Sequence, residues 1–250
     1  HARTTRQATY RGGFQAFVDE FAATLAGMGV EFKYHSAVKQ LLSKEDGGLT
    51  LSTASAEETY DQVLVTVSPA LLAKIAPQLP TDYLKGLLDL KSMGAVVMTL
   101  ALKHQLSREG YYWYNLPKDA GFPFLALVEH TNFLSPQKFG GNHILYCGDY
   151  LDTANEYFQL SKEELLQRFM PSLKRINPDF EADWVTGSWL VKTNYAQPVP
   201  LLNHSRNIPS IETPLKGLYF ASMSQVYPWD RGTNFAVEIA RRAAAIMLRQ

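Results

Sequence analysis

The C-terminal stretch from Gly217 to Leu248 constrains the fold of this 250-residue chain more than any other part of the sequence. It opens with a short apolar and aromatic run of the kind that forms a buried strand. A loop rich in Pro, Trp, Asp and Gly follows, and helical periodicity resumes after Gly232. The predicted helix begins near Thr233 or Asn234, with its apolar residues on one side: Ala236, Val237, Ala240, Ala244 and Leu248.

A helix that follows a strand and a glycine can bind an anion at its start. Its first backbone N–H groups lack partners within the helix, and the helix dipole is positive there. A plain packing helix explains the same pattern, so the residues alone leave both interpretations open.

A second helix start is predicted near the N-terminus, where Gly12 and Gly13 precede an amphipathic segment. We expect its apolar stripe to face the core: Phe14, Phe17, Val18, Phe21, Leu25 and Met28. A glycine pair at a helix start lets another group approach the backbone closely, although it also serves as an ordinary cap.

Two segments of the C-terminal stretch together resemble a family signature: Tyr219-Phe220-Ala221 and Asn234-Phe235-Ala236-Val237. They are similar, at matching separation, to the C-terminal signature of the flavin-containing amine oxidase superfamily, which includes monoamine oxidases, protoporphyrinogen oxidases and carotenoid desaturases. In that superfamily the strand end touches the ribityl chain and pyrophosphate of FAD, and the helix start faces the flavin N1–C2=O edge. Here Ser222 and Met223 stand where glycine and a carboxylate are usual.

The resemblance covers roughly Tyr10 to Leu248 and implies a set of FAD-binding residues. The valine equivalent to Val38 meets the adenine ring through its backbone in relatives, although a plain core strand residue is the alternative. The implied set is Gly12, Gly13, Val38, Ser222, Met223, Gly232, Asn234, Phe235, Ala236 and Val237.

The sequence contains no G-x-G-x-x-G turn, which in such flavoproteins holds the ADP half of FAD. We therefore predict a C-terminal fragment of a longer protein, which lacks the N-terminal dinucleotide-binding segment. FAD is expected in the full-length protein and not in this fragment. A complete small protein without that site is the alternative.

The middle of the chain is rich in aromatic residues, and strands are predicted at Tyr111–Asn115, Phe124–His130 and His143–Tyr150. Such a sheet can floor a cavity for a flat apolar ligand, or its aromatic residues can simply build the core. Met98 stands where amine oxidases carry a lysine linked to flavin N5, so the resemblance gives no support for that lysine's chemistry.

The predicted fold is α+β: a mixed or antiparallel substrate-domain sheet with flanking helices over residues 71–210, and part of an FAD-binding α/β domain over residues 10–70 and 211–250. Further strands are expected at Val30–Tyr34, Ala37–Leu42, Leu49–Thr53 and Tyr60–Val67, with a turn at Glu45–Gly48.

Composition limits the function classes. The formal net charge is zero without a long basic run, which argues against nucleic acid as partner. No apolar run reaches the length of a membrane span, and a single cysteine, Cys147, fits a cytoplasmic location. The six histidines show no metal-ligand spacing. Glu129 and His130 could move protons, but a solvated strand end is the preferred account, and no catalytic residue is assigned.

The sequence thus predicts an FAD-dependent oxidoreductase, which oxidises a C–N or C–C bond of a small apolar or aromatic substrate by hydride transfer to flavin. The alternative is a non-catalytic domain of the same fold that acts as a binding or interaction module.

Overall fold

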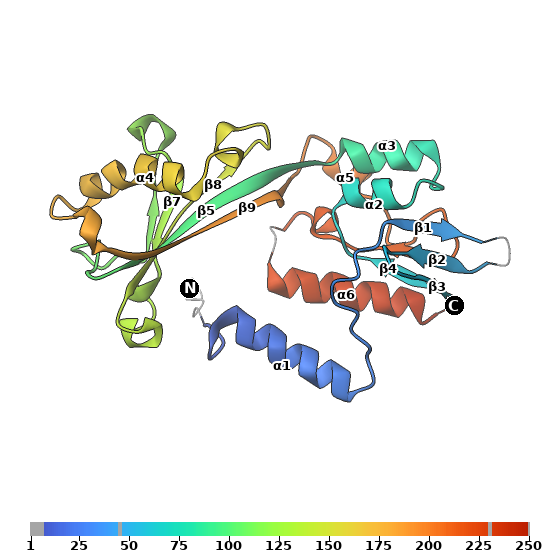
Figure 1. The fold of residues 1–250 in the computed structure, drawn as a ribbon. Helices are drawn as coiled ribbons and strands as arrows, with labels where there is room; N and C mark the ends of the chain where they lie inside the picture. Colours follow the sequence, from blue (N-terminus) through green and yellow to red (C-terminus); the bar gives the residue numbers. More distant parts are fainter. Residues whose placement is uncertain (1–7, 45–46, 230–231, 250) are drawn as a thin grey trace, which may run out of the picture.

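The computed structural model describes residues 8–44, 47–229 and 232–249, which form two units with separate sheets (Figure 1). We call residues 91–199 the five-stranded unit and the rest the helix-flanked unit. The helix-flanked unit contains α1 (Gly13–Gly27), β1 (Gln40–Ser43), β2 (Leu49–Ser52), β3 (Glu57–Tyr60), β4 (Val63–Val65), α2 (Pro69–Ile75), α3 (Thr81–Asp89), α5 (His204–Asn207), β10 (Leu218–Phe220) and α6 (Thr233–Met247).

The five-stranded unit is an antiparallel sheet in the order β6-β7-β8-β5-β9, covered on one face by α4 (Lys162–Ile176). Its strands are β5 (Lys91–Leu102), β6 (Trp113–Asn115), β7 (Ala126–Glu129), β8 (His143–Leu151) and β9 (Val185–Val199). Alternate residues of each strand face α4, such as Met98 and Cys147, and form the core with Leu165, Phe169 and Leu173. The intervening residues, such as Val97, Tyr146 and Gly148, lie on the other face of the sheet.

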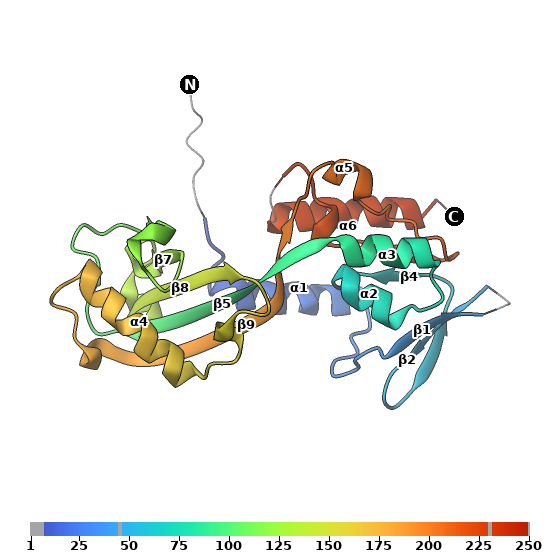
Figure 2. The same cartoon turned by 90° about the horizontal axis from the view of Figure 1, so that it is seen from above.

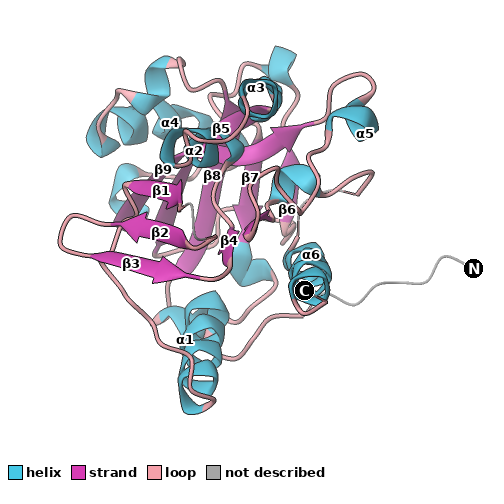
Figure 3. Cartoon of the chain, turned by 90° about the vertical axis from the view of Figure 1, so that its right-hand side faces the viewer, coloured by secondary structure: helices cyan, strands magenta, loops and turns pink. Residues whose placement is uncertain are grey.

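In the helix-flanked unit, β10 pairs in parallel with β4, and this pair joins distant parts of the chain. Phe220 and Leu218 pack with Leu41, Leu49 and the residues of α2 and α3 in one apolar cluster. On the other side, Tyr219 packs against Ile239 and Ala243 of α6. The strands β1, β2 and β3 form an antiparallel meander beside this pair (Figure 3).

One edge of the parallel pair is open. Val63 donates its N–H to Gly217 O at 2.9 Å, and Val65 O accepts from the N–H of Ala221 at 3.0 Å. Because alternate residues of a parallel strand bond to one neighbour, the N–H and C=O of Leu64 point to the opposite edge. Among the described residues, Leu64 has no backbone partner there. The outer edge of β10, by contrast, is occupied: Phe220 N–H donates to Ile211 O at 2.8 Å.

The strands predicted at Leu49–Thr53 and His143–Tyr150 and the helix predicted after Gly232 are confirmed, as β2, β8 and α6. The strand expected at Val30–Tyr34 is wrong: this segment is a loop and a turn, in which Phe32 and Tyr34 stack on each other instead of pairing with a strand. The predicted turn at Glu45–Gly48 lies partly outside the described residues.

The faces of two helices also differ from expectation. No residue of α1 is buried, and Phe14 is 76% exposed, so the predicted core-facing stripe meets no core among the described residues (Figure 3). In α6 the buried residues are Ile239 and Ala243, whereas Val237 and Leu248 face outward. The predicted stripe was rotated because alanines repeat all round this helix and carry little directional information.

Hydrogen exchange tests the open edge. We expect the Leu64 amide to exchange at least about tenfold faster than the neighbouring Val63 amide, since exchange protection follows hydrogen bonding and local opening. Residue-resolved NMR exchange on the chain measures both rates together, with Val63 as the internal control. Equal protection of the two amides would contradict an open edge.

Candidate functional site: two uncapped helix starts and an aromatic sheet face

The N-terminal ends of α1 and α6 lie on the same side of the helix-flanked unit, toward the five-stranded unit (Figures 1 and 2). Neither start has a side-chain cap. Gly12 and Gly13 have φ angles of 88° and 81°, a left-handed conformation that favours glycine. Two positive helix ends therefore point the same way.

The start of α6 leaves fewer amides than the sequence implied. The N–H groups of Phe235 and Ala236 both donate to the Gly232 carbonyl, at 3.1 and 3.0 Å, and Val237 lies inside the first helical turn. These three amides serve the helix itself. Of the residues in this turn, Thr233 and Asn234 have amides without a backbone partner among the described residues.

The end of β10 is held by Gln225, which is 8% exposed. Its Oε1 accepts from the Ser222 N–H at 2.7 Å, and its Nε2 donates to the carbonyls of Phe220 and Pro209 at 3.0 and 3.1 Å. One side chain thus satisfies three backbone groups. Sequence analysis did not single out Gln225, because a glutamine in a loop carries no pattern that marks it as buried.

Ser222 and Met223 follow directly. The Ser222 hydroxyl is buried without a hydrogen-bond partner among the described residues. The Gln225 amide approaches it as in a capping box but donates to the Ser222 carbonyl at 3.0 Å. Met223 is half-buried. Beside them, Ser224 shares a 2.6 Å hydrogen bond with the hydroxyl of Tyr195, which ties β9 of the five-stranded unit to this loop.

The face of the five-stranded sheet opposite α4 carries a hollow of about 320 Å³. Trp113, Tyr146 and Tyr150 border it, and small residues such as Ala126 and Gly148 form its floor. This agrees with the expectation that the aromatic sheet can floor a cavity. Other aromatic residues of the same segment, including Phe124, are in the core instead.

Among the described residues that line the hollow there is no lysine. Met98 is fully buried on the α4 face, so it lies on the opposite side of the sheet, and the residues of β5 that line the hollow are Ala95 and Val97. Asp149 borders the hollow, but it pairs with buried Val96, and strand alternation places its side chain on the α4 side. Burial raises the pKa of this carboxyl, and nearby Lys118 opposes the shift.

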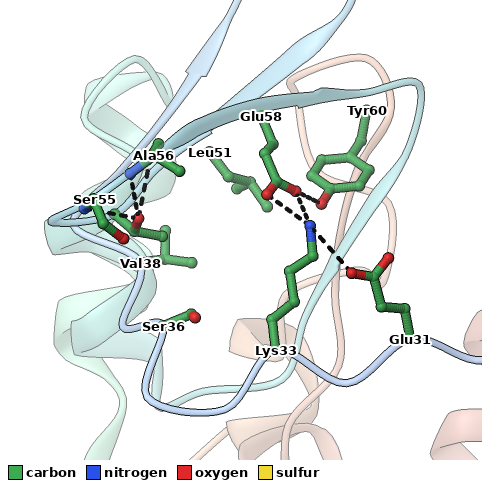
Figure 4. A pocket seen from close by; sticks show the side chains of 10 residues that line it. Glu31, Lys33, Ser36, Val38, Leu51, Ser55, Ala56, Glu58 and Tyr60 are labelled. Atoms are coloured by element: carbon green, nitrogen blue, oxygen red, sulfur yellow. Dashed lines mark hydrogen bonds and ion pairs between the residues drawn. The ribbon is translucent and has the colours of Figure 1, made fainter.

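Val38 lines a second, larger hollow of about 510 Å³ between the meander and the loop before it (Figure 4). Lys33 Nζ lies 2.5 Å from Glu58 Oε2 and 3.7 Å from Glu31, and the Tyr60 hydroxyl donates to Glu58. The hydrogen bond from Lys33 lowers the pKa of Glu58. Val38 lies outside any strand and is half-buried: it packs against the apolar cluster that contains Leu41 and Leu49 and also borders this open hollow.

The pair Glu129 and His130 is not a solvated strand end. Glu129 is fully buried and accepts hydrogen bonds from the N–H groups of Leu106 and Ser107 at 2.6 and 2.9 Å. His130 packs against Phe139 and Tyr146, and burial lowers its pKa. The carboxylate holds a loop, and the ring packs among aromatic side chains.

The sequence profile of the family described as flavin containing amine oxidoreductase matches residues 2–248. The chain belongs to this family. Among curated proteins, none matches the chain.

Solved structures share the fold at low sequence identity. A protein from Exiguobacterium sp. 255-15, to which a protoporphyrinogen oxidase activity has been attributed, matches 95% of this chain and 51% of its own, with a TM-score of 0.76 and 16% identity. Cyclohexylamine oxidase from Brevibacterium oxydans IH-35A is matched over 94% of this chain and 52% of the oxidase chain, with a TM-score of 0.69 and 16% identity. A putrescine oxidase variant is matched over 96% of this chain and 53% of the variant's chain, with a TM-score of 0.68 and 17% identity. The chain thus spans about half the length of these proteins.

The structure places the predicted site residues in three groups: the start of α1, the loop and helix after β10, and the separate hollow at Val38. The first two groups open on the side of the aromatic sheet. Within the described residues, no helix has the length and apolar character to cross a bilayer, and no cluster of three side chains could hold a metal ion.

Replacing Gln225 with Leu tests the support of the β10 loop. Two buried backbone groups and the half-buried Pro209 carbonyl lose their partner, so we expect the free energy of unfolding to fall by about 3 kcal/mol. Urea unfolding of Gln225→Leu measures this loss. Gln159→Leu, which changes an exposed glutamine, is the control and should cost less than about 0.5 kcal/mol. Similar losses for both variants would show that Gln225 is not such a support.

Proposed function

We propose that this chain is the C-terminal part of an FAD-dependent oxidoreductase, in which the flavin ring lies between the starts of α1 and α6 and the aromatic face of the five-stranded sheet. The observation behind this proposal is the shared direction of two uncapped helix starts, both preceded by glycine. The family membership supplies the cofactor class.

The residues present fit such a ring. Apart from its chain neighbours and the backbone of α1, no atom of the described residues lies within 4 Å of where a side chain at Gly13 would begin, so the approach to this backbone is open. The amides of Thr233 and Asn234 and the buried hydroxyl of Ser222 are groups without partners among the described residues. When bound, the flavin supplies the redox chemistry by accepting a hydride from a C–N or C–C bond of the substrate.

The protein residues would position and tune this group. The positive end of α6 favours negative charge at the flavin edge near Thr233 and Asn234. The Tyr195–Ser224 hydrogen bond holds this loop against the five-stranded unit, so the distance between cofactor and substrate face is constrained. Among the residues assigned here, none serves as an acid or base.

We assign the nucleotide half of FAD to the hollow at Val38 together with an α/β segment outside this chain. The open edge of β4 supports this assignment, because parallel strands are normally flanked by further strands on the same sheet. The exposed stripe of α1, including Phe14 and Phe21, gives such a segment an apolar surface. The cytoplasmic location remains a prediction.

A non-catalytic binding module is the second candidate. The absence of a lysine from the hollow and the replacement of the usual carboxylate by Met223 favour it. A module of this kind would bind a ligand on the aromatic face without flavin. Flavin content therefore separates the two candidates.

The test uses the product of the complete gene, purified with its flavin quantified by visible absorbance. We expect Gly13→Val to reduce FAD occupancy at least about tenfold, because a branched side chain would occupy the space that the ring needs. Gly29→Val is the matched control: Gly29 also has a positive φ, 95°, and open space around it, but it lies at the far end of α1.

Both glycine variants carry the same backbone strain, so both should lose similar stability. A gene product without flavin, which also fails to bind added FAD, would eliminate the enzyme. An equal loss of FAD in Gly13→Val and Gly29→Val would show that Gly13 does not line the flavin site.

A further inference from the structure

The two units are linked by a narrow part of the β5–β9 pair, which we call the neck. The chain passes between the units twice, at the start of β5 and at the end of β9 (Figures 1 and 2). In the neck, Lys91–Met93 pairs with Gln197–Val199, and Pro198 in this segment has no backbone N–H to donate. A ribbon of two short strands is only marginally stable by itself. The neck alone therefore sets the angle between the two units weakly.

A bulge separates the neck from the rest of the five-stranded sheet. Ala95 pairs with Thr193, but the next pair is Met93 with Gln197, so three residues of β9 lie opposite Gly94 alone. A Cβ atom at Gly94 would lie 2.7 Å from the Thr193 carbonyl oxygen, so the strands approach each other too closely here for any other residue. A bulge interrupts the ladder, bends the strand and redirects a side chain. The bulge is thus the natural pivot between the two units.

Tyr195 lies in the middle of this bulge and contacts the other unit. Its hydroxyl shares a hydrogen bond of 2.6 Å with Ser224 Oγ. Ser224 is 2% exposed and belongs to the turn Met223–Gln225, which the side chain of Gln225 holds against the end of β10. The neighbour of Tyr195 in the bulge, Ala196, borders the hollow on the aromatic sheet face. The bulge therefore connects the hollow directly to the loop that leads to α6.

We propose that Tyr195 is a positioning residue, whose hydrogen bond to Ser224 fixes the angle between the two units about the bulge at Gly94. Hinges of this kind are a few residues at the ends of elements, where a small change in backbone angles turns a whole unit. Without the bond, the five-stranded unit turns about the neck, and the distance from the hollow to the start of α6 varies. The proposal rests on the proposed function only in placing the flavin at the helix starts and the substrate at the hollow.

Double electron–electron resonance measures the arrangement of the two units in the complete gene product. Spin labels are attached to Lys85→Cys in α3 and Gln167→Cys in α4, which are exposed positions on different units. Cys147 is fully buried, and any cysteine outside this chain is replaced with serine. Tyr195→Phe should raise the fraction of molecules outside the main distance peak about fivefold, the effect of losing one ordinary hydrogen bond.

Two further variants and a control make the test specific. Ser224→Ala should produce the same rise, and the double variant Tyr195→Phe/Ser224→Ala should produce no more than either single variant, because all three lose the same bond. The matched control is Tyr157→Phe, which removes a tyrosine hydroxyl that donates to the Pro123 carbonyl at 3.1 Å within the five-stranded unit. Its distance distribution should equal that of the unsubstituted protein.

An unchanged distance distribution in Tyr195→Phe or in Ser224→Ala would overturn the proposal. So would an equal change in Tyr157→Phe, or effects of the two single variants that add in the double variant. The distances are measured with or without bound flavin, so these outcomes are distinct from a failure of the proposed oxidoreductase, which would appear as a flavin-free gene product.

Discussion

The parallel pairing of β10 with β4 is the interaction on which the rest of the structure depends. It joins Leu218–Phe220 to Val63–Val65 and so brings the C-terminal loop and helix next to the unit formed by the first part of the chain. Between these strands the chain leaves through β5 and returns through β9, which pair with each other in the five-stranded sheet. The segment between β4 and β10 thus forms the antiparallel five-stranded unit, and the chain then returns to pair with β4. The hydrogen bonds of Gln225 then fix the direction in which the chain leaves β10.

The two faces of the five-stranded sheet differ: one packs against α4, and the other carries the hollow. The core on the α4 face is built from apolar residues, and Met98 and Leu145 are fully buried there. On the other face, large exposed rings such as Trp113 and Trp189 have no helix over them among the described residues. A sheet with one covered face and one aromatic open face is stable as a fold and still offers a binding surface. In the proposed function, this surface faces the flavin ring that the two helix starts would hold.

Local patterns predicted much of this fold from sequence. The strand predicted at His143–Tyr150 and the helix predicted after Gly232 depend on short-range signals, and each appears in the structure, as β8 and α6. Contacts between residues far apart in the sequence could not be predicted in this way. The loop at Val30–Tyr34 has strand propensity but no strand partner, and the alanine-rich α6 has no clear stripe until Tyr219 selects Ile239 and Ala243 as its contacts. Similarly, the burial of Glu129 follows from the loop at Leu106 and Ser107, which is distant in sequence.

The central claim is that the amides of Thr233 and Asn234 face a flavin. The most direct measurement is the ¹H–¹⁵N NMR shift of these two amides in the complete gene product, recorded with the flavin oxidised and then reduced. The account predicts that both resonances move on reduction, because charge develops at the flavin edge next to them, while the distant amide of Gly29 stays in place. A protein that binds and reduces flavin with both resonances unmoved would contradict it.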